Sequence, residues 1–441
     1  MRPQFSTLAE IYEHSVTSFP KRTAAEFVGG AQSYTYAQFR DCCDNISKRL
    51  SNFGIGAGDK VAILSENSPN WSAAFFAITV YGRIAIPMLP ELSAGEVENI
   101  LVHSEAKAIF VSKKQLPKLS EEAIGRLKLV IAIGDLSFIK AEGSSYTCDG
   151  KVSRPTALDT AAILYTSGTT GKAKGVMLCH RNFCTNVLTS WYSYKIGPRD
   201  VFLSILPMAH TYEMSIGMLY PFAMGAKVEY LQKVPTPSIL IATLAKIRPT
   251  AMLSVPLIIE KIYRSSIVPT ISKSKFLSYL DKHAKGLLYT MVGMKLKKTF
   301  GGRIGFFGIG GAKLDPEVEV FLKKARFPYA IGYGLTETAP LICSAAPRRT
   351  WPGTTGRPVK GIEVKLEDVN PQTGEGEICV KGPNVMLGYY KDYERTESVL
   401  SQDGWFRTGD LASVDKKGRY SIKGRLGSVI IGASGENIYP E

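Results

Sequence analysis

The sequence predicts an α/β protein built from two stacked α/β subdomains with mainly parallel sheets, followed by a small β-barrel subdomain. Short apolar runs alternate with amphipathic segments through residues 1–352, which is typical of parallel strands covered by helices. Beyond residue 353 the strands become short and are joined by glycine-rich turns, which favours a barrel. With 441 residues, 45% of them hydrophobic, the chain is long enough for two or three packed units.

The first subdomain is predicted to begin with an amphipathic helix over 8–18. A turn at 67–70 opens a further helix, and residues 143–150 form a polar loop. Continuous apolar runs predict buried strands at 61–64, 108–111 and 129–133.

The second subdomain is predicted to begin near residue 160, with strands at 161–165, 251–255 and 303–307 and helices at 182–192 and 316–324. Barrel strands are expected at 362–366, 376–381 and 419–423. The predicted division of the chain is therefore 1–352 for the two α/β subdomains, 353–424 for the barrel, and 425–441 for a hinge and the stub of a C-terminal domain.

Composition argues for a cytoplasmic protein. The N-terminus has no apolar core of a secretory signal, and the seven scattered cysteines have no metal-site spacing, which is typical of reduced thiols. The longest weakly charged stretch, 201–226, contains His210 and Glu213 and is interrupted by prolines and glycines. It predicts buried core or a pocket wall, because a spanning helix would have to bury those polar groups.

The formal net charge of +15 is concentrated in one segment. Residues 261–300 carry nine lysines and arginines against a single acid, Asp281. This segment is either a solvated helical face or a surface for anionic lipid, at the inner face of a membrane, or for CoA phosphates. Nucleic acid is not expected as a partner, because no nucleic-acid motif accompanies the charge.

The strongest local signal is the loop YTSGTTGKAKG at 165–175, which follows an apolar strand. Its glycines let backbone N–H groups approach an anion, its hydroxyls donate hydrogen bonds, and Lys172 and Lys174 offset the charge of a polyphosphate. It is not a Walker loop, because Ala173 stands where a hydroxyl would coordinate magnesium. The loop predicts a polyphosphate site, and the alternative is a turn without a ligand.

Two further glycine-rich segments follow predicted strands. In 308–313, Lys313 replaces the third glycine of a dinucleotide turn, which disfavours a Rossmann cofactor. In 331–338, Tyr333 stands between two glycines, where its ring can lie against a purine. Thr336 and Glu337 offer a hydroxyl and a carboxylate for phosphate and Mg²⁺. The alternative for 331–338 is a glycine-rich turn with a packed tyrosine.

Together with GWFRTGDL at 404–411 and IKGR at 422–425, these segments resemble the ordered motifs of the adenylate-forming superfamily. That superfamily includes acyl-CoA synthetases, peptide-synthetase adenylation domains and beetle luciferases. The resemblance covers nearly the whole chain. It implies an enzyme that uses Mg·ATP to convert a carboxylate to an acyl-adenylate.

The resemblance also implies roles for individual residues. Residues 166–174 would grip pyrophosphate, Asp410 would accept both ribose hydroxyls, and Arg425 would lie near the ribose and the α-phosphate. The implied catalytic residues are Lys172, Thr336, Glu337 and Arg425, and the implied metal ligands are Thr166 and Glu337. The implied nucleotide-binding set is Thr166, Ser167, Gly168, Thr169, Thr170, Gly171, Lys172, Lys174, Gly311, Ala312, Tyr333, Gly334, Thr336, Asp410 and Arg425.

The segment LPMAHTYE at 206–213 resembles the long-chain acyl-CoA synthetase version of a variable motif. Thr211 occupies the position where amino-acid-activating relatives place an aspartate. An amino acid substrate is therefore disfavoured, because its buried ammonium would be unpaired. The expected substrate contacts are His210, beside the acyl carboxylate, and Met214 and Met218 in an apolar wall that could equally be ordinary core.

The expected function, in the full-length parent, is that of a long-chain fatty-acid–CoA ligase with ATP, Mg²⁺ and the co-substrate CoA. Alternatives are a ligase for a medium-chain or aromatic acid, transfer to an acyl-carrier protein, and a nucleotide-binding module without turnover. Family members continue past the position of Glu441 into a domain that supplies a catalytic lysine, so we expect this polypeptide alone to show weak activity or none. Gly427 stands at the family's hinge position, where its backbone freedom permits rotation.

Overall fold

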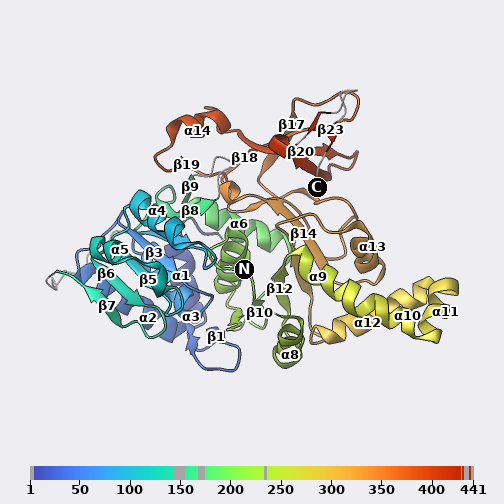
Figure 1. Ribbon diagram of the computed structural model, residues 1–441, viewed down its shortest axis with the longest axis horizontal. Helices are drawn as coiled ribbons and strands as arrows, with labels where there is room; N and C mark the ends of the chain where they lie inside the picture. The colour runs from blue at the N-terminus through green and yellow to red at the C-terminus, as the bar shows by residue number, and fades with distance from the viewer. Residues whose placement is uncertain are drawn as a thin grey trace.

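The computed structural model describes residues 4–143, 154–166, 174–232, 236–428, 430–431 and 437–438. Two large sheets with helices around them form the body of the molecule, a smaller sheet lies over one end, and a helical arm projects from the side (Figure 1). The large sheets are mainly parallel, which confirms the predicted α/β fold.

The first large sheet has the strand order β19-β9-β8-β4-β3-β5-β6-β7. Val61 and Ile63 of β3 pack with α2 and α3, while Ala62 and Leu64 pack with α4 and α5. A sheet covered on both faces suits continuous apolar strands. Its strands are β3 (Lys60–Leu64), β4 (Ile84–Met88), β5 (Ala108–Val111), β6 (Leu129–Ala132), β7 (Phe138–Ala141), β8 (Thr160–Thr166), β9 (Lys174–Cys179) and β19 (Gly388–Tyr389).

The helices around this sheet begin at clear caps. Thr7 caps α1, and Ser68 caps α3 with Pro69 at its first position, as the turn at 67–70 predicts. All of α3 is buried, because it also contacts β1 of the second sheet. The helices are α1 (Leu8–Ser18), α2 (Tyr36–Asn52), α3 (Pro69–Thr79), α4 (Ala94–Ser104), η1 (Leu116–Lys118), α5 (Glu121–Arg126) and α6 (His180–Ser193).

The second large sheet has the order β16-β15-β14-β13-β12-β10-β11-β1-β2. Strands from the start of the chain join it, since Ala25 of β1 pairs with Val228 of β11. β8 and β9, which follow residue 160 in the chain, belong to the first sheet, whereas β1 and β2, which precede it, belong to the second. Residue 160 therefore does not separate the two sheets, and the division of the chain into subdomains stays a prediction. The strands are β1 (Thr23–Phe27), β2 (Ser33–Thr35), β10 (Val201–Ser204), β11 (Lys227–Tyr230), β12 (Ala251–Ser254), β13 (Phe306–Ile309), β14 (Tyr329–Gly334), β15 (Leu341–Ala345) and β16 (Arg357–Pro358).

The segment predicted as a barrel forms an antiparallel sheet in the order β17-β18-β20-β21. Within the described residues β17 pairs only with β18, whereas β21 pairs with β20 and, at Tyr420, with Gly356 just before β16. The two edge strands therefore do not meet, and the predicted closed β-barrel is not formed. Four strands are too few to close, since even small barrels need about five. The strands are β17 (Glu363–Glu367), β18 (Gly376–Lys381), β20 (Phe406–Val414) and β21 (Tyr420–Arg425), with α14 (Tyr393–Val399) beside them; η5 (Leu426–Ser428), β22 (Ile430–Ile431) and β23 (Asn437–Ile438) follow.

The remaining helices connect the strands of the second sheet. The π-helix η2 (Glu213–Leu219) and α7 (Tyr220–Ala223) are buried, which confirms that 201–226 is core. No helix in the described part of the chain is both long enough and apolar enough to cross a membrane. The others are α8 (Pro237–Ile247), α9 (Pro256–Ile262), the π-helix η3 (Tyr263–Ile267), α10 (Val268–Lys273), α11 (Lys275–His283), α12 (Lys285–Thr299), α13 (Pro316–Lys324) and η4 (Thr336–Thr338).

Candidate functional site

A cleft of about 540 Å³ lies where the ends of β8 and β14 face the smaller sheet. This volume is in the range of small-molecule sites, roughly 300–1,000 Å³. Five residues predicted from the sequence line the cleft together: Thr166, Lys174, Thr336, Glu337 and Arg425. The fold therefore collects residues that are up to 259 positions apart in the chain, from Thr166 to Arg425.

The predicted polyphosphate loop is anchored at both ends in the first large sheet. β8 ends at Thr166 and β9 begins at Lys174, and these two residues are paired across the strands. The Oγ1 atom of Thr166 is buried and has no hydrogen-bond partner in the described part of the chain. The predicted Ser167, Gly168, Thr169, Thr170, Gly171 and Lys172 lie outside the described residues.

Lys174, Glu337 and Tyr389 form a triangle of hydrogen bonds at the cleft. Lys174 Nζ lies 2.8 Å from Glu337 Oε1 and 3.0 Å from the Tyr389 hydroxyl, which in turn donates to Glu337 Oε1 at 2.9 Å. Burial and the neighbouring Glu337 raise the pKa of Tyr389, so its hydroxyl remains a donor. Tyr389 has no distinguishing sequence signal, and only the pairing of β19 with β9 brings it here.

Two residues of the cleft, Thr166 and Glu337, fit a Mg²⁺ ion. Mg²⁺ prefers oxygen ligands, and the buried, unpartnered Thr166 hydroxyl and the Glu337 carboxylate supply them in one cleft. Within the described residues no group of three His, Cys, Asp or Glu side chains is placed to hold a metal. A protein site with few ligands is usual for Mg²⁺, which keeps waters and takes phosphate oxygens from its substrate.

A second cluster joins Tyr333 on β14 to the smaller sheet. The Tyr333 hydroxyl donates to Asp410 Oδ2 at 2.8 Å, and Arg425 Nε donates to Asp410 Oδ1 at 2.9 Å. Burial raises the pKa of Asp410, while the hydrogen bonds from Tyr333 and Arg425 act in the opposite direction. Gly311 and Ala312 are exposed just after β13, the strand that pairs with β14, and do not line the cleft.

Replacing Asp410 with alanine should weaken binding of ATP or AMP by about 1–3 kcal/mol, because polar groups would lose their acceptor. Calorimetric titration of both nucleotides measures this change. The exposed Asp403, in the loop before β20, provides a control, and Asp403→Ala should leave the affinity as it is. Equal affinity of Asp410→Ala and wild type would contradict the predicted ribose contact.

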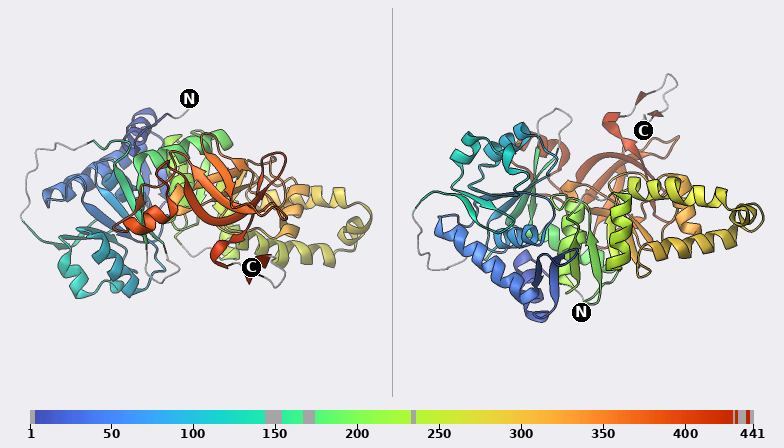
Figure 2. Two further views of the ribbon diagram at one scale, coloured as in Figure 1. Left: turned by 90° about the horizontal axis from the view of Figure 1, so that it is seen from above. Right: turned by 60° about the horizontal axis from the view of Figure 1, so that its bottom comes forward.

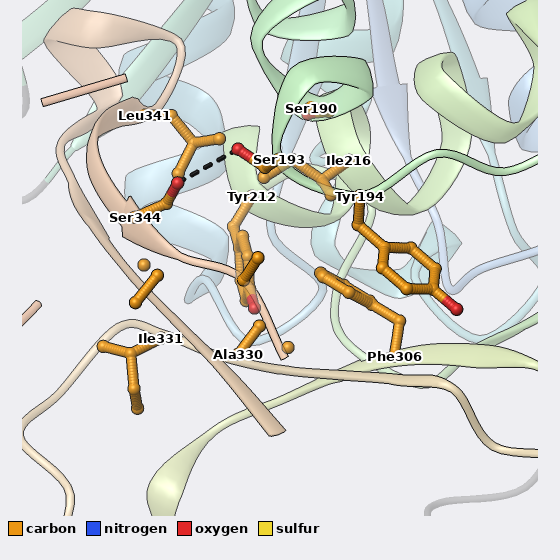
Figure 3. A pocket seen from close by; sticks show the side chains of 14 residues that line it. Ser190, Ser193, Tyr194, Tyr212, Ile216, Phe306, Ala330, Ile331, Leu341 and Ser344 are labelled. Carbon is orange, nitrogen blue, oxygen red and sulfur yellow. Dashed lines mark hydrogen bonds between the residues drawn. The ribbon is translucent and has the colours of Figure 1, made fainter. Parts of the chain in front are cut away.

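The structure places Met214 and Met218 in the hydrophobic core rather than in a pocket. Both are buried on η2, whereas His210, in the loop before it, is exposed. Tyr212 and Ile216 instead line a small apolar pocket of about 40 Å³ (Figure 3). Two residues are about half a helical turn, so the methionines face the opposite side of the helix.

This apolar pocket lies between α6, η2 and three strands of the second sheet. The side chains of Phe306 and Ala330 lie beside the Tyr212 ring, whereas Leu341 lies near Ser193 and Ser344, which hydrogen-bond to each other at 3.1 Å (Figure 3). A Cβ atom on Gly308 would lie 2.8 Å from the Tyr212 hydroxyl oxygen. Glycine at 308 therefore leaves room for the tyrosine that closes the pocket, a role that the glycine-rich motif does not reveal.

Glu213 is the buried carboxyl group next to this pocket. Burial raises the pKa of Glu213 to about 8, and its Oε2 atom has no hydrogen-bond partner among the described residues. The folded protein thus holds this proton up to about pH 8, while the unfolded chain loses it near the ordinary pKa of 4.5. Raising the pH through this window should therefore favour unfolding.

Replacing Glu213 with glutamine should remove this pH dependence. We expect the variant to be more stable than wild type by roughly 2–4 kcal/mol near pH 8 and similar to it near pH 5. Urea unfolding of both proteins at the two pH values measures the difference. A stability gap that is the same at both values would show that Glu213 does not titrate in this range.

The chain is similar to known proteins over nearly its whole length. The chain matches the family described as "AMP-binding enzyme" over residues 12–390. It is 32% identical to the peroxisomal long chain acyl-CoA synthetase 6 of Arabidopsis thaliana, over all of this chain and 69% of that protein. It is 27% identical to fatty acyl-CoA synthetase A of Dictyostelium discoideum, over 94% of this chain and 68% of that protein.

Among solved structures, the chain is similar to ATP-bound MatB from Rhodopseudomonas palustris. The TM-score is 0.78 at 25% identity, and the match covers 98% of this chain and 81% of that one. The likeness therefore extends over nearly the whole chain.

Proposed function

The chain belongs to the AMP-binding enzyme family, and from this we propose that it activates a long-chain fatty acid with Mg·ATP and transfers the acyl group to CoA. The observation that carries the proposal is the cleft in which Thr166, Lys174, Glu337 and Arg425 come together. A cation, hydroxyl and carboxylate set at the ends of parallel strands suits a nucleotide triphosphate and its metal.

In the proposed first step, a carboxylate oxygen of the fatty acid attacks the α-phosphorus of ATP. The bond to the bridging oxygen breaks, and pyrophosphate leaves with the negative charge. Lys174 and Arg425 lie in the cleft as cations that stabilise this charge, and the neighbouring Lys172 belongs to the same proposal. Mg²⁺, held by Thr166 and Glu337, would neutralise phosphate oxygens.

In the proposed second step, the thiol of CoA gives up its proton to water, its sulfur attacks the acyl carbonyl carbon, and AMP leaves with the electron pair of the C–O bond. Asp410 and Tyr333 keep the nucleotide in position through the ribose and the adenine. The protein's contribution in both steps is the alignment of reacting groups and the exclusion of wrong geometries. Thr336, which lines the same cleft, would hold the α-phosphate.

A fatty acid is the proposed substrate because the pocket around Tyr212 is apolar. The position that would pair an amino acid's ammonium is Thr211, which is buried and uncharged. Two relatives with whole-chain similarity are described as acyl-CoA synthetases for long-chain or fatty acids. The pocket of about 40 Å³ holds only part of an alkyl chain, so the side chains around Tyr212 must move to admit the rest.

A series of fatty acids from short to long, with aromatic acids and acyl-carrier protein as alternatives, tests the substrate class. Each is supplied with ATP and CoA, and product thioesters are identified by mass spectrometry. We expect the highest kcat/KM for long-chain acids with CoA. Preference for an aromatic acid, or product only with carrier protein, would replace the proposed substrate or acceptor.

A larger side chain in the pocket next to Tyr212 should lower the activity toward long-chain acids more than the activity toward short ones. Ala330 lines the pocket, and leucine at this position would occupy the space next to Tyr212. We expect Ala330→Leu to lower kcat/KM for a long-chain acid by roughly tenfold or more, because one methylene of misfit already costs about tenfold. A short acid such as butyrate should be affected much less, and ATP affinity should not change. Equal losses for both acids would contradict the assignment of this pocket to the alkyl chain.

The location that we propose is the cytoplasm, with peripheral contact to the inner face of a membrane through residues 261–300. The six described cysteines are free thiols, in agreement with a reducing compartment. A fatty acid substrate partitions into bilayers, so contact with a membrane would place the enzyme at its substrate.

A further inference from the structure

The helical arm projects from the body between β12 and β13 (Figures 1 and 2). It comprises α9, η3, α10, α11 and α12, and the inner faces of these helices, together with α8, surround an apolar cavity of about 270 Å³. Leu277 and Leu296 line the cavity, and Leu280 and Leu288 are buried beside it. The arm therefore has an apolar interior of its own, and this interior accounts for the hydrophobic residues that are buried within the arm.

A second set of hydrophobic side chains on the arm is exposed to solvent. Val268, Phe276, Tyr279, Leu287 and Met294 expose between 42% and 63% of their surface, and none of them lines the cavity. Phe276 and Tyr279 are three residues apart on α11, and Leu287 and Met294 are seven apart on α12. Each pair therefore shares one face of its helix. Isolated exposed apolar residues need no explanation, but such a gathering marks an interaction surface.

The same helices carry the basic residues of 261–300, and all nine of them are exposed. Arg264 is paired with Asp315, whereas none of the eight lysines has an ion-pair partner in the part of the chain that the structure describes. On α11, Lys275 and Lys282 flank the aromatic pair in the sequence, and on α12 Lys298 lies one turn from Met294. Lysines and apolar side chains are thus interleaved on the outer surface of the arm.

We propose that the outer faces of α11 and α12 dock the protein on an anionic phospholipid bilayer. The lysines would bind lipid phosphates, and the exposed rings and aliphatic side chains would enter the interface between headgroups and acyl chains. A phosphate-binding surface alone would not need Phe276, Leu287 and Met294, and an apolar protein interface would not gather the six lysines of α11 and α12, none of which is ion-paired within the described residues. This inference deepens the membrane contact of the proposed function but does not depend on turnover.

Sedimentation of the full chain with vesicles tests the docking surface. The vesicles are made of phosphatidylcholine with and without roughly one third phosphatidylserine. We expect strong binding only to the anionic vesicles, and we expect Lys275→Glu with Lys282→Glu to weaken it by roughly tenfold or more. Phe276→Ser with Tyr279→Ser should weaken it by a similar factor, because the lysines alone give only surface attraction.

Lys21→Glu with Lys113→Glu is the matched control, since both lysines are exposed on the part of the body that carries α1 and β5, away from the arm. This control should bind like wild type. The inference is overturned if wild type ignores anionic vesicles, if the control weakens binding as much as the arm variants do, or if the arm lysine variant loses affinity for CoA while vesicle binding is unchanged. The last result would assign the lysines to CoA phosphates.

Turnover of fatty acid dispersed in detergent separates this inference from the proposed function. Neither arm variant should change that rate, because the substituted side chains are exposed and lie outside the cleft. Vesicle binding together with turnover that prefers another class of acid would count against the proposed function alone, and turnover without vesicle binding would count against the docking surface alone.

Discussion

Replacing Glu337 with glutamine should lower the rate of acyl-adenylate formation by about 10²–10³, the loss typical for one group that stabilises charge in a transition state. The amide oxygen of glutamine can still accept from Lys174 and Tyr389, so the triangle of hydrogen bonds should survive. The negative charge that Lys174 balances, and that would attract Mg²⁺, is lost. Pyrophosphate release in single-turnover experiments measures the rate.

Two controls isolate the role of the Glu337 charge. Glu363→Gln makes the same substitution at an exposed position of β17, where no contact to the cleft exists, and should leave the rate unchanged. ATP affinity of Glu337→Gln should also respond less to added Mg²⁺ than that of wild type. A Glu337→Gln rate within about threefold of wild type would contradict the metal and charge roles together.

Replacing Gly334 with alanine should disrupt both stability and activity. A Cβ atom at this position would lie 1.8 Å from the Pro340 carbonyl oxygen, so the backbones of β14 and β15 would have to separate. The turn between these strands carries Thr336 and Glu337. We expect a loss of roughly 2–4 kcal/mol in unfolding free energy and loss of most nucleotide affinity.

Gly332 provides the comparison on the same strand. A Cβ atom there would lie 3.3 Å from Leu341 Cδ2, a side-chain atom that can shift. Gly332→Ala should therefore be much milder in thermal melting and in ATP titration. If Gly334→Ala melts and binds like Gly332→Ala, the close approach of β14 and β15 is not required.

Much of the fold can be predicted because its signals are local. The helices at 8–18 and 316–324 agree with α1 and α13 to the residue, since Thr7 and Asp315 are N-caps and Pro316 begins α13. The pairing of β1 with β11 joins segments about two hundred residues apart, and no local pattern encodes it. The open four-stranded sheet differs from the predicted barrel for the same reason, because closure depends on which edge strands meet.

The proposed nucleotide site is more predictable from the sequence than the proposed acyl site. Thr166 and Lys174 belong to one glycine-rich segment that follows a predicted strand, and Thr336 and Glu337 belong to another. Arg425 is expected only from the resemblance to the adenylate-forming superfamily. Whether Met214 and Met218 line a pocket depends on how η2 is rotated about its axis. The sequence does not indicate this rotation, because η2 has apolar residues both on the side that faces the core and on the side that faces the pocket. Which side faces the pocket is decided by Gly308 and Tyr212, whose contact appears only in three dimensions.

The most direct test of the central claim is the exchange of labelled pyrophosphate into ATP in the absence of CoA. If the cleft forms an acyl-adenylate, exchange should require a long-chain fatty acid, should need Mg²⁺, and should fall sharply in Glu337→Gln. Exchange that ignores the fatty acid, exchange that does not need Mg²⁺, or hydrolysis of ATP to ADP instead would contradict the claim.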